Sequence, residues 1–332
     1  MESMQATQLN SLGFSPKSLR KISSISCGGT ALNFIAPKTV DSYHSILRLL
    51  TQARVDFIVI GSLSNTLFRE GDIHTPIIST MCLTSFSVRT SFVDVEPGML
   101  LARLVALFCR YGDSSLVDLS GIPGTVAGAI VNNSGAYGTL LSSRLLQISL
   151  MESTNNLSTT VMTYDDMNYS YRSSALKDKK TSFGILSVRL LMIPDSRCVD
   201  SSLQRLATSA KRRAIEQYCP FPNLGSVLAT ADLSTHVRPL WKSYFLKFIS
   251  YTLGFLCSLR LKIDKRFIYH AAFLFIFSKQ LSVKTRESLS PHNQNVIFNS
   301  LGNPDLVQYA LSELSLIAPS LQVEWNLYLS IL

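Results

Sequence analysis

Glycine is concentrated in one short segment of the chain. Residues 121–138 contain five of the sixteen glycines in 332 residues. Ordering glycine costs backbone entropy, so such a cluster is typical of positive φ values or of close approach to another group. The spacing is neither G-x-G-x-x-G nor G-x-x-x-x-G-K-S/T, which argues against the common dinucleotide and P-loop motifs. Two interpretations stay open: a loop whose bare N–H groups cradle a ligand, or a tight structural turn.

The composition is that of a globular protein with a large core. Hydrophobic residues make up 46% of the chain and charged residues 16%, and the length suffices for two domains or one large one. The net charge of +9 suits an anionic ligand. The charges are scattered, however, and no arginine-rich arm is present, so we do not expect a nucleic-acid partner.

Cysteine spacing and apolar runs indicate the compartment. The six cysteines form no C-x-x-C pair, which predicts neither a metal site nor a disulfide framework and favours a reducing cytoplasm. Residues 1–19 lack the apolar core of a secretory signal. The uncharged runs 248–259 and 267–278 have twelve residues each, whereas a spanning helix needs about 18–20. We expect buried helices there and no membrane span; an apolar segment resting on a membrane surface is the alternative.

Hydrophobic periodicity predicts a mixture of helices and strands. The expected helices lie near residues 41–53, 100–110, 200–218 and 306–318. The expected strands lie near residues 57–60, 92–95, 145–151, 159–163, 185–192 and 321–329. A change to polar, helical sequence after Pro194 places the main domain boundary near residue 195.

A second polar loop, residues 61–65 (G-S-L-S-N), directly follows the apolar strand 57–60. Short polar loops after buried strands are where α/β proteins bind ligands. Ser64 and Asn65 could cap the next segment or donate hydrogen bonds to a cofactor phosphate. The residues alone do not decide between these roles.

The glycine-rich segment closely resembles the flavin-binding signature of the UDP-N-acetylenolpyruvoylglucosamine reductases, also called UDP-N-acetylmuramate dehydrogenases. That family carries G-I-P-G-T-V-G-G-A followed by N-A-G-A-Y-G, from which Ala127 and Ser134 depart as small-for-small replacements. The family also carries G-x-G-S-N, where Leu63 departs while Ser64 and Asn65 match. The resemblance covers residues 24–235 and 285–328 and is greatest to actinobacterial members.

The resemblance implies the fold and the cofactor. It implies an α+β protein in which an N-terminal extension, 1–23, precedes a two-lobed FAD-binding domain of the PCMH / vanillyl-alcohol-oxidase type at 24–195. An α+β substrate-binding domain would occupy 196–332. The residues that would hold FAD are Gly61, Ser62, Ser64, Asn65, Gly121, Ile122, Pro123, Gly124, Thr125, Gly128, Asn133, Gly135, Ala136 and Tyr137.

Three further residues would carry the chemistry. Alone, Arg172 beside tyrosines is typical of a stacked surface arginine, and a serine such as Ser226 after Pro-x-x-Gly is usually a turn residue. A carboxylate such as Glu324 in a final strand usually faces solvent. The family patterns Y-R-x-S, P-S-A-G-S and L-x-x-E-V imply otherwise: Arg172 would bind the substrate carboxylate, Ser226 would donate a proton and Glu324 would assist it. Departures from the family occur at Thr230, in place of asparagine, and at Asn293, in place of histidine.

The activity implied by the resemblance is the NADPH-dependent reduction of UDP-N-acetylglucosamine enolpyruvate to UDP-N-acetylmuramate, a step of peptidoglycan precursor synthesis, by a cytoplasmic monomer. Two alternatives stay open. One is another FAD oxidoreductase of the same fold, in which Arg172, Ser226 and Glu324 would not converge. The other is a non-catalytic descendant that binds flavin or nucleotide sugar, which the departures at Leu63 and Thr230 suggest.

Overall fold

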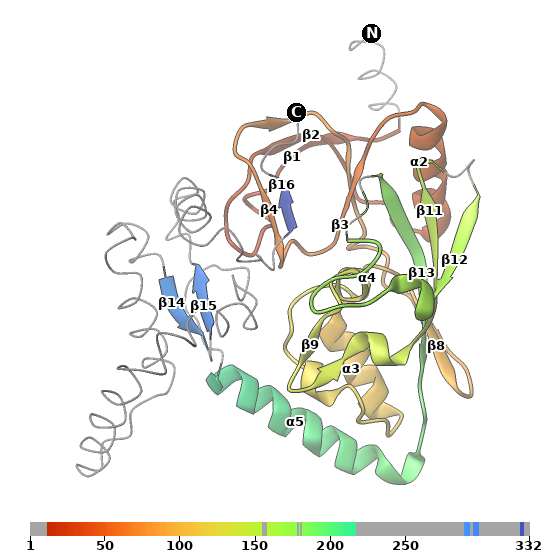
Figure 1. Cartoon of the computed structure of the whole chain (residues 1–332), viewed down its shortest axis with the longest axis vertical. Helices are drawn as coiled ribbons and strands as arrows, with labels where there is room; N and C mark the ends of the chain where they lie inside the picture. Colours follow the sequence, from red (N-terminus) through yellow and green to blue (C-terminus); the bar gives the residue numbers. More distant parts are fainter. Residues whose placement is uncertain are drawn as a thin grey trace, which may run out of the picture.

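The computed structural model describes residues 12–154, 158–177, 179 and 181–216, together with the strand segments 289–292, 295–298 and 326–328. Within these residues the chain forms two lobes, each built on a five-stranded sheet (Figure 1). A mixed parallel and antiparallel sheet forms the first lobe, and an antiparallel sheet with helices forms the second. The expected α+β class is confirmed.

The sheet of the first lobe is mixed. Its strand order is β1 (Ser15–Ser18), β2 (Thr30–Ile35), β6 (Ile77–Ser79) and β3 (Ile58–Ile60), with β5 (Asp72–Ile73) also pairing with β2. The β1–β2 pair is antiparallel, whereas β2–β6, β2–β5 and β3–β6 are parallel. Strands β3 and β6 are apolar and buried, because parallel strands are covered on both faces. Strand β3 therefore delivers the loop at 61–65 from the interior to the edge of the sheet.

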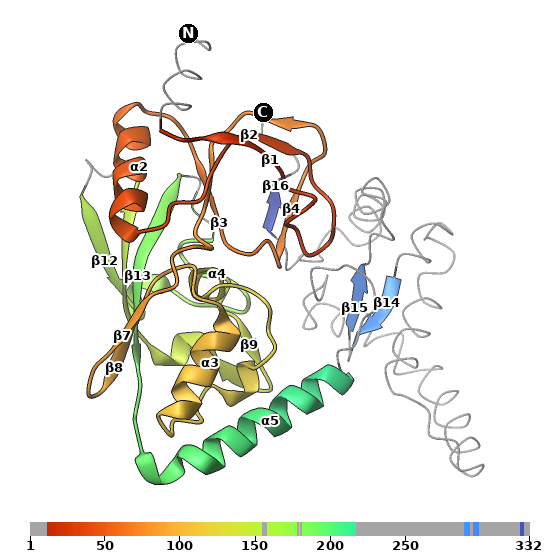
Figure 2. The same cartoon turned by 180° about the vertical axis from the view of Figure 1, so that it is seen from behind.

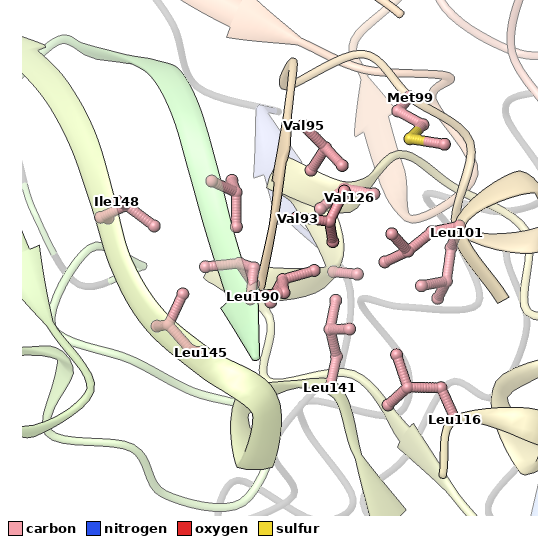
Figure 3. Packing of buried hydrophobic residues seen from close by; sticks show 14 of the residues in the cluster. Val93, Val95, Met99, Leu101, Leu116, Val126, Leu141, Leu145, Ile148 and Leu190 are labelled. Atoms are coloured by element: carbon pink, nitrogen blue, oxygen red, sulfur yellow. The ribbon is translucent and has the colours of Figure 1, made fainter. Parts of the chain in front are cut away.

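The sheet of the second lobe is entirely antiparallel. Its order is β12 (Thr159–Thr163), β11 (Leu145–Glu152), β13 (Phe183–Leu191), β8 (Phe92–Val95) and β7 (Phe86–Val88). Helices α3 (Leu101–Arg110) and α4 (Val126–Val131) pack on it, and Figure 3 shows Leu101, Val126 and Leu190 converging in the shared core. This core immobilises α4, which lies inside the glycine-rich segment.

Helix α2 (Val40–Gln52) joins the two lobes. Thr39 caps it by accepting a hydrogen bond from the Ser42 backbone N–H at 3.2 Å. The buried face of the helix packs on Ile78 of the first sheet and on Met151 and Leu186 of the second sheet. The relative placement of the lobes thus follows from burial of one amphipathic helix between them.

The hydrophobic periodicity of the sequence predicted most of the longer helices and strands. The helices expected near 41–53, 100–110 and 200–218 are α2, α3 and α5 (Val199–Glu216). The strands expected between residues 57 and 192 are confirmed as β3, β8, β11, β12 and β13. Within the strand expected at 321–329, residues Asn326–Tyr328 form β16, which pairs in parallel with β4 (Thr66–Phe68) (Figure 1).

Some expectations lie outside the described residues. These are the helix near 306–318 and the two apolar runs at 248–259 and 267–278. Among the helices that the structure does describe, none combines the length and hydropathy needed to span a bilayer. The structure adds a short antiparallel pair, β14 (Leu289–His292) with β15 (Asn295–Phe298), that the sequence did not predict.

Candidate functional site

The two polar loops singled out from the sequence meet at the junction of the lobes. The Ser64 hydroxyl donates a hydrogen bond to the Pro123 carbonyl oxygen at 3.2 Å and accepts one from the Ser62 hydroxyl at 3.4 Å. The Cα of Gly61 lies so close to Thr125 that a Cβ at position 61 would collide with the Thr125 hydroxyl. Residues about sixty positions apart thus form one continuous backbone surface.

Its composition indicated that the glycine-rich segment is a single loop or turn, but the structure divides it into several elements. A turn at 121–125 leads into helix α4, and a hairpin follows, formed by β9 (Gly135–Ala136) and β10 (Thr139–Leu140). Thr125 caps α4 by accepting a hydrogen bond from the Gly128 N–H at 3.4 Å. The hydrogen bonds between β9 and β10 and the Thr125 side-chain cap hold the segment in place from within itself.

Glycine is required by conformation at the turn before α4. Gly121 has φ = +78° and Gly124 has φ = +131°, values that side-chain-bearing residues rarely adopt. A Cβ on Gly124 would also lie 3.1 Å from the Ser64 hydroxyl oxygen. The glycines therefore leave bare backbone where the two loops meet, which is the surface a phosphate-bearing cofactor needs.

Leu63, the departure from the family pattern, adopts the backbone conformation that glycine would take. Its φ is +51°, which costs a residue with a side chain about 1–2 kcal/mol. The side chain is only 3% exposed and packs with Ile60 and Phe68 in the core of the first lobe. Burial of the leucine side chain offsets this backbone cost.

Backbone strain is concentrated in this region. Seven described non-glycine residues have positive φ. Four of them lie in the candidate site: Leu63, Asn133, Tyr137 and Arg172. Strained residues of this kind persist only where the surroundings hold them, and they gather at functional sites.

Arg172, the predicted carboxylate-binding residue, lies against the second half of the glycine-rich segment. Its guanidinium donates hydrogen bonds to the carbonyl oxygens of Gly135, at 2.9 Å, and Asn133, at 3.5 Å. It also lies over the Tyr171 ring, 5.5 Å from the ring centroid. Lys177 donates a hydrogen bond to the Arg172 carbonyl oxygen at 2.9 Å. The two carbonyl oxygens and the Tyr171 ring orient the guanidinium, and Lys177 holds the Arg172 backbone.

The side chain of Asn133, predicted to bind the cofactor, instead makes hydrogen bonds to other parts of the second lobe. It is buried, it donates to the Ser170 carbonyl oxygen at 2.8 Å, and it accepts from the Ser142 hydroxyl at 2.7 Å. These bonds tie the loop that carries Arg172 to the glycine-rich segment. No sequence pattern indicated this pairing, because residues 133 and 170 belong to separate motifs.

The other predicted cofactor residues lie on the same segments. Ile122 and Ala136 pack against the core of the second lobe. Gly135 leaves room for Leu140, whose side chain a Cβ at position 135 would strike. Asn65 directly precedes β4. Every predicted cofactor residue therefore lies on the two loops or on the α4–hairpin unit.

Tyr169, next to the Arg172 loop, is not suited to acid–base chemistry at neutral pH. Burial raises the pKa of its hydroxyl above the ordinary value, and the neighbouring Tyr164 raises it further. The two rings lie 5.5 Å apart, centroid to centroid. The hydroxyl stays protonated throughout the physiological range.

Helix α5 contributes contacts that the sequence analysis did not assign to the site. The Arg212 guanidinium stacks over the Tyr137 ring, 3.9 Å from its centroid, and the Arg213 side chain lies against Gly121. The sequence signals were the basic run Lys211–Arg213 and the resemblance to the reductases, in which Arg213 precedes Ser226 at the family's usual interval. Ser226, Thr230, Asn293 and Glu324 lie outside the described residues.

Comparison with known proteins connects this geometry to a cofactor. Residues 31–156 match the "FAD binding domain" family. This stretch contains both loops and helix α4, and the bare glycine backbone fits a cofactor that carries a pyrophosphate. The expectation of FAD is confirmed.

Curated relatives agree on one enzyme. The UDP-N-acetylenolpyruvoylglucosamine reductase of Caldicellulosiruptor bescii is 30% identical over 209 residues, covering 63% of this chain and 65% of that protein. The same-named protein of Carboxydothermus hydrogenoformans is 29% identical over 216 residues, covering 65% and 68%. Over this region the chain is similar to the UDP-N-acetylenolpyruvoylglucosamine reductases. The matched region spans about two thirds of the length of these relatives.

A solved structure of the reductase family shares the fold. The UDP-N-acetylenolpyruvylglucosamine reductase of Thermus caldophilus superimposes with a TM-score of 0.64 at 19% identity, covering 95% of this chain and 98% of that one. The expected fold, a two-lobed FAD-binding domain of the PCMH / vanillyl-alcohol-oxidase type within an α+β protein, is confirmed. The boundary near residue 195 stays a prediction.

Proposed function

We propose that this protein is an NADPH-dependent flavoenzyme that reduces UDP-N-acetylglucosamine enolpyruvate to UDP-N-acetylmuramate in peptidoglycan precursor synthesis. One observation carries the proposal beyond cofactor binding: Arg172 is held by the carbonyl oxygens of Gly135 and Asn133, on the segment that binds FAD. A substrate anion bound by this guanidinium would lie beside the cofactor segment. The same proposal makes residues 196–332 the substrate-binding domain and the protein a cytoplasmic monomer.

In this proposal the protein binds and orients the substrate and supplies the proton. When bound, FAD supplies the redox chemistry between NADPH and the enol ether. The planar fork of Arg172 pairs with the substrate carboxylate, and its fixed plane reduces the ordering needed on binding. Charge that develops toward this carboxylate is stabilised by Arg172, with Glu324 assisting, while the Ser226 hydroxyl delivers a proton to the neighbouring carbon.

Separate measurement of the two half-reactions tests the assignment. Anaerobic stopped-flow absorbance follows bleaching of the flavin by NADPH and its recovery on addition of the enolpyruvyl substrate. Ser226→Ala should leave the first rate nearly intact and slow the second by about 10²–10⁴-fold. Ser226→Cys should restore part of it, because a thiol of similar size is also a proton donor.

Arg172→Lys should slow the second half-reaction and weaken substrate binding, because an ammonium cannot form two parallel bonds. Arg189 offers a matched control: it is paired in bidentate fashion with Asp94, at 2.7 and 3.0 Å, and stacks over Phe92 in the second sheet. Arg189→Lys should leave both rates unchanged. Flavin reduced by NADPH and then reoxidised equally fast in wild type and Ser226→Ala would remove the serine from the mechanism. A flavin-bearing protein that NADPH does not bleach would refute the proposed activity altogether.

A further inference from the structure

Helix α5 follows the second lobe toward the FAD-binding segment. It lies beside α3, along the chain that runs from residue 112 to residue 121 (Figure 2). The Ser202 hydroxyl donates to the Gly112 carbonyl oxygen at 3.0 Å, and the Ser120 hydroxyl donates to the Ser209 hydroxyl oxygen at 3.1 Å. All these serine side chains are buried, so the helix is anchored at two points along one face.

The contact face continues to the end of the helix. Ser202, Leu206, Ser209 and Arg213 are spaced at three or four residues, which places them on one face. Leu206 packs against the core of the second lobe between the two serine anchors. Since Ser120 immediately precedes Gly121, the anchor at Ser209 brings the next turn of α5 onto the start of the glycine-rich segment.

The last turn contacts both ends of that segment. The Arg213 Cδ lies 2.8 Å from the position that a Cβ on Gly121 would occupy, so its aliphatic stem fills the space that the glycine leaves. The neighbouring Arg212 stacks on Tyr137, at the tip of the β9–β10 hairpin. Gly121 and Tyr137 both have positive φ, +78° and +51°. Two consecutive residues of one helix therefore contact both ends of the FAD-binding segment, each at a residue with positive φ.

We propose that Arg212 and Arg213 are positioning residues that hold residues 121–138 in the FAD-binding conformation and thereby set the affinity for FAD. Fixing a segment before its ligand arrives removes ordering entropy from the binding step. The two residues differ in how they act: Arg213 through its methylene stem and Arg212 through its cation over the ring. This inference rests on FAD binding alone and stands independently of the proposed reductase activity.

Substitutions separate the stem of Arg213 from its charge. Arg213→Ala removes both and should raise the dissociation constant for FAD about tenfold or more. Arg213→Met keeps an unbranched stem without the charge and should stay within about threefold of wild type. Arg212→Gln removes the cation from Tyr137 and should weaken FAD binding about threefold to tenfold, the range expected for a cation–π contact. The conservative Arg212→Lys should restore part of this affinity.

Arg205 on the same helix provides the charge-matched control. Its guanidinium donates to the Ser114 hydroxyl at 2.7 Å in an exposed hydrogen bond, away from residues 121–138. Arg205→Ala removes one positive charge from α5 and should bind FAD within about twofold of wild type, since exposed interactions contribute little. Equal weakening by Arg205→Ala and Arg213→Ala would overturn the proposal, because it would indicate a general loss of charge or helix packing.

The apo-protein is titrated with FAD, and binding is monitored by the quenching of FAD fluorescence. Visible circular dichroism of the bound flavin is a second readout. The expected result is weaker binding and an altered flavin signal in Arg213→Ala, and recovery of both in Arg213→Met. Wild-type affinity in Arg213→Ala overturns the proposal. Should that variant fail to fold, the exposed Arg212 decides: wild-type affinity in Arg212→Gln overturns the inference. No titration uses NADPH or the enolpyruvyl substrate, so failure of the proposed activity is a separate result.

Discussion

The backbone conformation of Leu63 predicts an unusual response to substitution. Leu63 is buried with φ = +51°, so its side chain stabilises the fold while its backbone carries a cost. Replacement by alanine removes the side chain but keeps the cost, whereas replacement by glycine removes both. Comparison of the two variants therefore isolates the backbone term.

The magnitudes follow from the burial and from φ. Leu63→Ala should lower the free energy of unfolding by about 2–5 kcal/mol, as is usual for a buried leucine. At an ordinary position, glycine would be less stable than alanine by about 0.5–1 kcal/mol for backbone entropy and by about 0.8 kcal/mol for the lost methyl group. At position 63, glycine also regains the left-handed cost of about 1–2 kcal/mol. The two variants should therefore be equally stable within about 0.5 kcal/mol, from the balance of these terms.

Leu67 in β4 is the matched control, since it is 4% exposed in an extended strand. There, glycine should be less stable than alanine by about 1–2 kcal/mol. Urea unfolding of the four FAD-saturated variants, monitored by far-ultraviolet circular dichroism, gives both differences. Leu63→Gly should also retain FAD, because glycine readily adopts the same backbone conformation. An equally large glycine penalty at positions 63 and 67 would refute the left-handed assignment.

Two further substitutions test the cradle and the junction of the lobes. Gly124→Val should yield folded protein that has lost FAD, because valine disfavours φ = +131° and its Cβ would lie 3.1 Å from the Ser64 hydroxyl oxygen. Gly138→Asn, where the added Cβ meets open space and asparagine tolerates φ = +86°, should keep the flavin absorbance; stoichiometric flavin in both proteins would contradict the cradle. The buried Tyr43 hydroxyl has no hydrogen-bond partner among the described residues. Tyr43→Phe should therefore raise the free energy of unfolding, measured by urea denaturation, by about 1 kcal/mol. The exposed Tyr111→Phe should leave it unchanged, and a clear loss of stability in Tyr43→Phe would show that the hydroxyl is satisfied.

Local sequence patterns predicted the longer elements because each carries its own signal. Helix α2 was expected near 41–53 and is observed at Val40–Gln52, since its buried residues recur at helical spacing after a capping residue. Several strands were missed, among them the six-residue β2 and some of the shortest strands. Strands β4 and β5 have three and two residues, and two- or three-residue strands show no alternation by which to recognise them. Helix α4 was hidden because its six residues include a glycine.

The sequence by itself determined which residues can form the cofactor surface. The glycines of residues 121–138 allow the positive φ values at Gly121 and Gly124, and the apolar run before residue 61 requires a buried strand that ends in a polar loop. The chemical character of Arg172, with its planar set of donors, is likewise a property of the residue type alone.

The tertiary structure decided which of these residues meet. Contact between Ser64 and Pro123 requires the two lobes to pack around α2, and the stacking of Arg212 on Tyr137 requires α5 to follow the second lobe. It also decided that a leucine can occupy position 63, because only the surrounding core supplies the burial that offsets its backbone cost. The Ser64–Pro123 and Arg212–Tyr137 contacts join residues 59 or more positions apart. Their energy depends on packing between elements, and no local periodicity in the sequence indicates it.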